Sequence, residues 1–237
     1  MVLCHIMTQN IWGKVFLNSD FGDKRRNSRA RKIATMVENS EGGSVSSILF
    51  DRADQKGALR FMNNSFISPE NILEGFIKEN IENIQTNHVL LVEDSSELNF
   101  SWRKTKLEGL GPVGNGIDQG FFLHPGLLVD PKKETILGLG SAYFWHREYG
   151  EESEKISKKK QLYKKKKIEE KESFRWLKIP GDVRKILPEA IRMTVVADRE
   201  ADIFDLFHER NTGKLGENIE LLIRACRDRN LDTENTT

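Results

Sequence analysis

One stretch decides the fold: Val89-Leu90-Leu91-Val92-Glu93-Asp94, a continuous apolar run that ends abruptly in two acids. Such a run is typical of a strand buried on both faces. A second stretch with the same form, Thr194-Val195-Val196-Ala197-Asp198, lies farther along the chain. Strand candidates also cover Phe121 to Val129 and Ile136 to Trp145. Because helical patterns separate the later strands, we expect a mixed α/β sheet.

The chain after residue 171 shows this alternation in detail. We expect a short helix over Glu172 to Leu177, a break at Pro180-Gly181, and another helix over Val183 to Ile191. A helix over Ala201 to Arg210 and a strand over Ile219 to Ile223 follow. This alternation of strands and helices also predicts a mixed α/β sheet.

Two segments interrupt the pattern. The five glycines between Gly109 and Gly120 indicate a loop. Residues 151–171 hold nine lysines beside several glutamates and almost no apolar residue, so we interpret a charged insertion at about 150–171 as a solvated helix or a mobile segment rather than as a DNA-binding arm.

The first 85 residues predict helices. Asp23 can cap a helix whose apolar stripe includes Ala30 and Val37, and Gly42-Gly43 ends it. A second helix covers Asp51 to Asn63, and a third begins with Ser68 as cap and Pro69 at its first position. We therefore expect a small helical domain at 1–70 and an α/β domain at 71–237.

Composition excludes several classes of protein. Charged residues make up 31% of the 237 residues but nearly cancel to +1, so affinity for nucleic acid must come from local clusters. Cys4 and Cys226 lack the spacing of a zinc site or a disulfide framework. No segment resembles a membrane span or an export signal, which predicts a cytoplasmic protein.

Asp94 and Asp198 are the candidate catalytic residues. Each directly follows a predicted strand, and the carboxyl ends of strands in open α/β sheets are where ligands bind. Carboxylate oxygens are the ligands that Mg²⁺ prefers, and two ions about 4 Å apart can activate a nucleophile and stabilise a leaving oxygen. The alternative is that each aspartate only caps the turn that follows it.

A basic helix face is the candidate DNA interface. Six basic residues and one acid lie between Asp23 and Lys32, and Arg25, Arg29 and Lys32 share one face, away from the apolar stripe. Such a face can lie along phosphates, and arginine can also read guanine edges. The alternative is an ordinary solvated face.

Five patches in the same order resemble the transposon-five branch of the insertion-sequence-four transposases. The clearest is Val196-Ala197-Asp198-Arg199-Glu200-Ala201-Asp202-Ile203, which is similar to that family's second-aspartate signature. Val92-Glu93-Asp94-Ser95-Ser96-Glu97-Leu98 resembles the strand with the first aspartate. The other patches are Gly22-Asp23-Lys24-Arg25-Arg26, Gly57-Ala58-Leu59-Arg60-Phe61 and Lys171-Glu172-Ser173-Phe174-Arg175-Trp176.

The resemblance implies a helical domain that binds transposon ends, followed by a ribonuclease H-like core that cuts and joins double-stranded DNA. In that family two aspartates and a glutamate bind two Mg²⁺ or Mn²⁺ ions, and the resemblance places the aspartates at Asp94 and Asp198. The residues expected at DNA, from the basic face and the similar patches, are Lys24, Arg25, Arg26, Arg29, Lys32, Arg60, Lys171, Arg175 and Arg224.

The family's third acid, which lies in a downstream helix, and its dimerisation region have no counterpart in this sequence. We therefore expect an incomplete core that binds transposon ends in a bacterial nucleoid but cuts DNA more slowly than complete relatives do. Two alternatives remain open. The first is a non-catalytic DNA-binding protein that inhibits a full-length transposase. The second is a stand-alone nuclease in which Glu93 or Asp202 completes the metal site.

Overall fold

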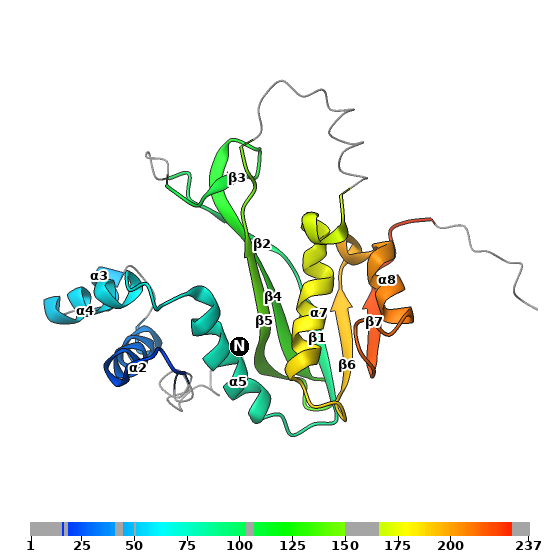
Figure 1. The fold of residues 1–237 in the computed structure, drawn as a ribbon, viewed down its shortest axis with the longest axis horizontal. Helices are drawn as coiled ribbons and strands as arrows, with labels where there is room; N and C mark the ends of the chain where they lie inside the picture. Colours follow the sequence, from blue (N-terminus) through cyan, green and yellow to red (C-terminus); the bar gives the residue numbers. More distant parts are fainter. Residues whose placement is uncertain are drawn as a thin grey trace, which may run out of the picture. The chain divides into compact units, whose positions relative to one another are not determined.

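The computed structural model describes residues 16, 19–40, 45–49, 51–102, 107–149 and 166–228 (Figure 1). The chain divides into two compact units, Met1–Ile84 and Gln85–Thr237, and each is described here by itself. The predicted domain boundary at residue 70 falls in the first turn of the last helix of the first unit, which begins at Pro69. The residues outside these ranges include Cys4, Gly42-Gly43 and residues 150–165, which make up most of the charged insertion.

Helices make up the described part of the first unit. They are α2 (Lys24–Glu38), α3 (Val45–Ile48), α4 (Arg52–Met62) and α5 (Pro69–Glu82). α2 and α5 begin at the predicted caps, Asp23 and Ser68, and α4 begins after Asp51. The side chains of these three residues each accept a hydrogen bond from a backbone N–H of the first turn. The expected helices are confirmed, and the short α3 is an addition.

An aromatic core joins these helices. Phe21, which precedes α2, meets Phe61 of α4 edge to face with ring centroids 5.4 Å apart. Ala30 of α2 completes the buried cluster, and Ile33 and Ile72 pack at its margin. The apolar stripe of α2 therefore faces the other helices, which leaves its basic residues outward.

The second unit contains one seven-stranded sheet within the described residues. Its strands are β1 (His88–Glu93), β2 (Ser96–Asn99), β3 (Gly111–Val113), β4 (Asp118–Asp130), β5 (Thr135–Trp145), β6 (Arg192–Ala197) and β7 (Ile219–Ile223). The order is β2-β4-β1-β6-β7, with β3 and β5 also paired to β4. β1, β6 and β7 run parallel, and β4 is antiparallel to its partners.

Two helices cover one face of this sheet, α7 (Arg175–Ile186) and α8 (Phe204–Asn211) (Figure 1). The alternate residues of β1 and β6 that face them are fully buried, including Leu91 and Val195. The approach is close at Gly126 of β4, where a Cβ atom would lie 2.5 Å from Ile179 Cγ2 of α7. The predicted fold class, N-terminal helices followed by a mixed sheet with helices, is confirmed.

The predicted helix break at Pro180-Gly181 is wrong, because α7 runs through both residues. A proline inside a helix removes one backbone hydrogen bond and costs about 3 kcal/mol. Here Trp176, Leu177 and Val183 are buried against the sheet, as is Pro180 itself. Burial of four such side chains, each contributing about 1.5–3 kcal/mol, offsets that cost.

Three other boundaries differ from the prediction. The glycine-rich loop contains β3 and the beginning of β4, since its turn residues Gly114 and Gly116 occupy only the tip, with positive φ. α8 begins at Phe204 rather than Ala201, because the 3-10 turn η3 (Arg199–Ala201) comes first. α7 is preceded by two similar turns, η1 (Ile168–Glu170) and η2 (Glu172–Phe174), and ends before Pro188.

Within the described ranges, no helix has the length and apolar character needed to cross a membrane.

Candidate carboxylate site and DNA interface

Asp94 and Asp198 lie at the same edge of the sheet. β1 and β6 are parallel neighbours whose register pairs Val92 with Val196, so each aspartate comes two residues after a paired valine. Both are exposed. The expectation that the two acid-bearing strands lie side by side is therefore confirmed, while a shared cation remains a prediction.

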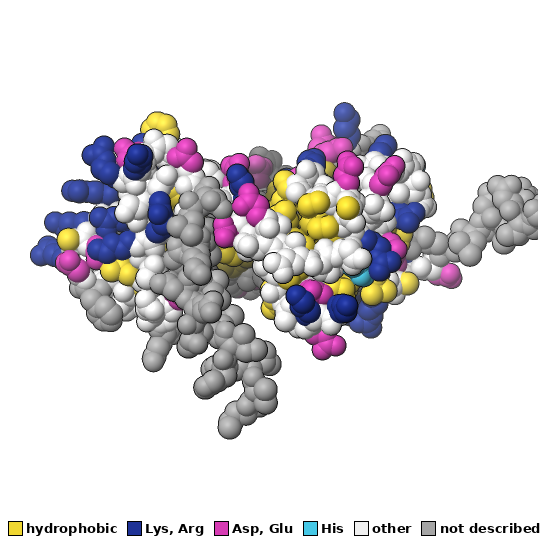
Figure 2. Space-filling view, turned by 90° about the horizontal axis from the view of Figure 1, so that it is seen from below, with side chains coloured by type: hydrophobic (Ala, Val, Ile, Leu, Met, Phe, Trp, Pro, Cys, Tyr) yellow, Lys and Arg dark blue, Asp and Glu magenta, His cyan; other side chains and the backbone are white. Residues whose placement is uncertain are grey.

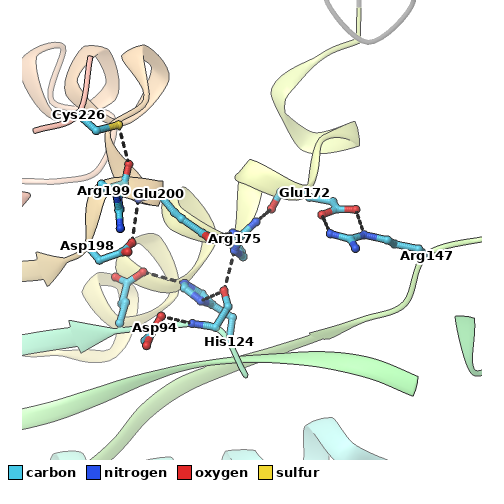
Figure 3. A network of polar contacts seen from close by, with 11 residues as sticks. Asp94, His124, Arg147, Glu172, Arg175, Asp198, Arg199, Glu200 and Cys226 are labelled. Atoms are coloured by element: carbon cyan, nitrogen blue, oxygen red, sulfur yellow. Dashed lines mark hydrogen bonds and ion pairs between the residues drawn. The ribbon is translucent and has the colours of Figure 1, made fainter. Parts of the chain in front are cut away.

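Each aspartate also holds the turn that follows it. The Oδ1 atom of Asp94 accepts a hydrogen bond from the backbone N–H of Ser95 at 2.7 Å. The Oδ1 atom of Asp198 accepts one from the backbone N–H of Glu200 at 2.8 Å (Figure 3). The capping role that the sequence left open is thus present, and it fixes the direction of both carboxylates rather than excluding a further ligand.

Arg224 stands at the same edge, because it follows β7, which continues the parallel array. Leu222 pairs with Val196, and the Arg224 backbone N–H donates to the Ala197 carbonyl at 3.3 Å. The segment after it is fixed by Asp202, whose buried Oδ2 atom accepts the backbone N–H groups of Cys226 and Arg227 at 2.7 and 2.8 Å.

Neither acid proposed to complete a nuclease site is available at this edge. Asp202 is 1% exposed and holds the segment after β7. Glu93 is 2% exposed and lies on the helix-covered face, because it alternates with Leu91 along β1. The stand-alone nuclease that uses Glu93 or Asp202 stays a hypothesis, to which this arrangement adds no support. No three His, Cys, Asp or Glu side chains converge as a metal site in the part of the chain that the structure describes.

A buried Glu93–His124 pair lies under the Asp94 turn. The Glu93 Oε2 and His124 Nε2 atoms are 3.1 Å apart, and both side chains are fully buried. His124 Nδ1 lies 3.0 Å from Ser95 Oγ, and the ring meets Trp176 edge to face at 4.4 Å. This pair joins β1, β4 and α7 directly behind the exposed acid.

Burial shifts the pKa of each member of the pair toward its neutral form. Burial raises the pKa of Glu93 well above its usual value of 4.5. Burial, followed by the nearby charge of Arg175, lowers the pKa of His124 to about 3. These shifts favour the arrangement in which protonated Glu93 donates to His124 Nε2 and the Nδ1–H group of His124 donates to Ser95 Oγ. Sequence reasoning did not find this pair. The strand alternation that places Glu93 on the face of Leu91 was the available signal.

Arg175 does not occupy the position expected of a DNA contact. It is 9% exposed, at the first turn of α7, and its guanidinium donates to Ser95, Glu172 and Glu200 (Figure 3). The guanidinium also lies over Trp145 and Trp176 at 5.2 and 5.1 Å from the ring centroids. Such burial directs the guanidinium into the protein. Lys171, also expected at DNA, is half-buried between η1 and η2.

The basic side chains of the first unit gather on α2 and α4. Figure 2 shows Lys and Arg side chains over this unit, on the left of the view. α2 carries six of them and one acid, whereas α5 carries four acids and one lysine. Lys24, Arg25 and Arg60 are exposed, and the side chain of Arg25 is 93% exposed even though it pairs with Asp23.

Three of the predicted DNA-contact residues are held by the protein. Arg29 and Lys32 both contact Asp54 Oδ1 of α4, at 2.9 and 2.6 Å. The hydrogen bond from Lys32 lowers the pKa of Asp54 most strongly, and the one from Arg29 lowers it further. Arg26 donates to the Phe21 carbonyl and lies over the Phe66 ring. Asp54, which orients two cations of the basic face, was not predicted from the sequence.

A comparison with protein families supports the assignment of a DNA interface to the first unit. Residues 11–67 match the family model described as transposase DNA-binding. No match was found among curated proteins. The matched region contains α2 and α4, so the first unit carries a transposase DNA-binding region with DNA as its partner.

Proposed function

We propose that this chain is a transposase that binds double-stranded transposon ends through α2 and α4 and presents Asp94 and Asp198 as metal ligands in a ribonuclease H-like core. The single observation that carries the proposal is the parallel pairing of β1 with β6, beside a matched transposase DNA-binding region. Two exposed carboxylates at adjacent strand ends suit phosphodiester chemistry better than a purely structural role.

The donor set fits Mg²⁺ or Mn²⁺. Mg²⁺ is commonly bound by one or two carboxylates, and water and substrate phosphates supply the remaining ligands. Asp94 and Asp198 provide two such groups, and each is directed by a backbone N–H. When bound, the ions would activate an attacking oxygen and stabilise the leaving oxygen of a phosphodiester.

The residues of the chain itself would do the remaining work. The basic residues of α2 and α4 hold the duplex by its phosphates. Arg224, which is exposed beside Asp198, is placed to contact a phosphate near the carboxylates. The buried Glu93–His124 pair holds the Asp94 turn from below, so the carboxylate keeps its direction without a charge in the core.

Combined replacement of Lys24, Arg25 and Arg60 by alanine is expected to weaken binding of a mixed-sequence duplex oligonucleotide. Each lost phosphate contact should lower the slope of log affinity against log salt concentration by about 0.9. The measurement is fluorescence anisotropy of a labelled duplex at several salt concentrations.

The matched control replaces three cations outside the proposed interface, Lys78, Lys132 and Lys185. It removes the same charge but should leave the salt slope unchanged. Equal loss in both triple variants would show that net charge, rather than the α2–α4 surface, determines binding. A nicking assay with Mn²⁺ on the same duplex, repeated with Asp94→Ala, separates a cleaving protein from one that only occupies DNA.

A further inference from the structure

One buried guanidinium contacts both turns that follow the acid-bearing strands. Arg175 Nε donates to Ser95 Oγ at 2.9 Å, and Arg175 Nη2 donates to Glu200 Oε2 at 2.6 Å. A third bond, from Nη1 to the Glu172 carbonyl at 2.8 Å, anchors it to the beginning of its own helix. The Arg175 side chain is 10% exposed, whereas the Glu200 side chain is 60% exposed, so the guanidinium is buried and its bond to Glu200 reaches the surface.

Each of the two contacts joins Arg175 to the residue whose backbone N–H holds one of the aspartates. The Ser95 backbone N–H donates to Asp94, and Ser95 Oγ accepts from Arg175. The Glu200 backbone N–H donates to Asp198, and Glu200 Oε2 accepts from the same guanidinium (Figure 3). Ser95 and Glu200 therefore connect the two carboxylates through a single residue of α7.

The surroundings make this connection rigid. The guanidinium lies over Trp145 and Trp176, and Ser95 Oγ is also held by His124 Nδ1 at 3.0 Å. A planar guanidinium donates in fixed directions, whereas a lysine ammonium is a single point charge on a flexible stem. Lysine could therefore not hold Ser95 and Glu200 at once in the same geometry.

We propose that Arg175 is a positioning residue that fixes the spacing of Asp94 and Asp198 so that both face one divalent cation. This inference rests on the proposed function, because it assigns the two acids to one metal site. Residues that orient metal ligands without touching the metal typically change metal affinity about 10–100-fold when they are replaced. The competing role, attachment of α7 to the sheet alone, would affect stability but not metal affinity.

The test measures Mn²⁺ affinity of the full chain from the electron paramagnetic resonance signal of free Mn²⁺, with thermal unfolding recorded on the same samples. Arg175→Gln should weaken Mn²⁺ binding about tenfold or more. Arg175→Lys should recover only a small part of the loss. The matched control is Arg147→Gln, which breaks an ion pair with Glu172 and a contact over Phe122 but touches neither acid-bearing turn. It should lower thermal stability and leave Mn²⁺ affinity within about twofold, since the carboxylates keep their hydrogen bonds.

Ser95→Ala and Glu200→Ala keep the inference testable if Arg175→Gln does not fold. Each variant breaks one contact with Arg175, so each should weaken Mn²⁺ binding several-fold. The double variant should lose less affinity than the product of the two single fold-losses. Unchanged affinity in folded Arg175→Gln, or fully independent effects of the two contacts, would overturn the inference alone. Mn²⁺ binding that is absent, or indifferent to Asp94→Asn, would overturn the proposed metal site and this inference with it.

Discussion

Replacement of His124 by alanine should lower the free energy of unfolding of the second unit by about 3–5 kcal/mol, comparable to truncation of a buried aromatic side chain. The ring is 0% exposed and packs edge to face on Trp176, so its removal leaves a cavity. It also removes the partner of Glu93 Oε2, and Glu93 Oε1 already has no partner within the described residues. A buried carboxyl group would then have both oxygens unpaired.

Urea denaturation followed by tryptophan fluorescence measures this loss. His146→Ala is the matched control, because His146 is exposed near the end of the neighbouring strand β5, and its removal should change stability by less than about 0.5 kcal/mol. A His124→Ala variant that lost less than about 1 kcal/mol would contradict the structural role assigned to the ring, since buried truncations cost several times that amount.

The Glu93–His124 pair should make the stability of metal-free protein fall toward both ends of the pH range. Above about pH 4.5 the folded Glu93, whose pKa burial raises, keeps a proton that the unfolded chain loses, so this group lowers stability as pH rises. Between about pH 6.5 and 3 the unfolded His124 binds a proton that the folded ring does not, because burial lowers the pKa of the folded ring, so this group lowers stability as pH falls. The two effects oppose each other between about pH 4.5 and 6.5.

Glu93→Gln isolates the alkaline part of this profile. The glutamine amide can still donate to His124 Nε2 but does not titrate. The variant should therefore gain stability relative to the unsubstituted protein above pH 4.5, by up to about 1.4 kcal/mol for each pH unit until the folded Glu93 titrates. Chemical denaturation across the pH range, with a chelator present, provides the comparison. Parallel profiles for the two proteins would show that Glu93 is charged in the folded state.

Local signals predicted most of the fold. The caps at Asp23, Asp51 and Ser68 satisfy backbone donors within one turn, so the sequence alone places the beginnings of these helices. The prediction failed at Pro180, where the outcome depends on how much of α7 is buried against strands that lie far away in the sequence. Local propensity cannot measure that burial.

In the candidate site, too, local signals predicted some residues, whereas the roles of others depend on contacts between distant parts of the chain. Asp94 and Asp198 could be found because each ends an apolar run, and parallel pairing then brings them to one edge. Arg175 looked like a surface cation, because nothing within its own helix shows that Ser95 and Glu200 meet it across the fold. Arg29 and Lys32 were likewise grouped with free cations, since their shared partner, Asp54, lies on a different helix.

The most direct test of the account is a crystal structure of the full chain grown or soaked with Mn²⁺, with anomalous diffraction recorded at the manganese edge. We expect an anomalous peak within about 2.5 Å of a carboxylate oxygen of both Asp94 and Asp198, the distance at which hard cations bind oxygen. Arg175 should bridge Ser95 and Glu200 in the same crystal. A peak bound to one aspartate alone, or no peak at this edge of the sheet at saturating Mn²⁺, would contradict the proposal that the two strands form one metal-binding site.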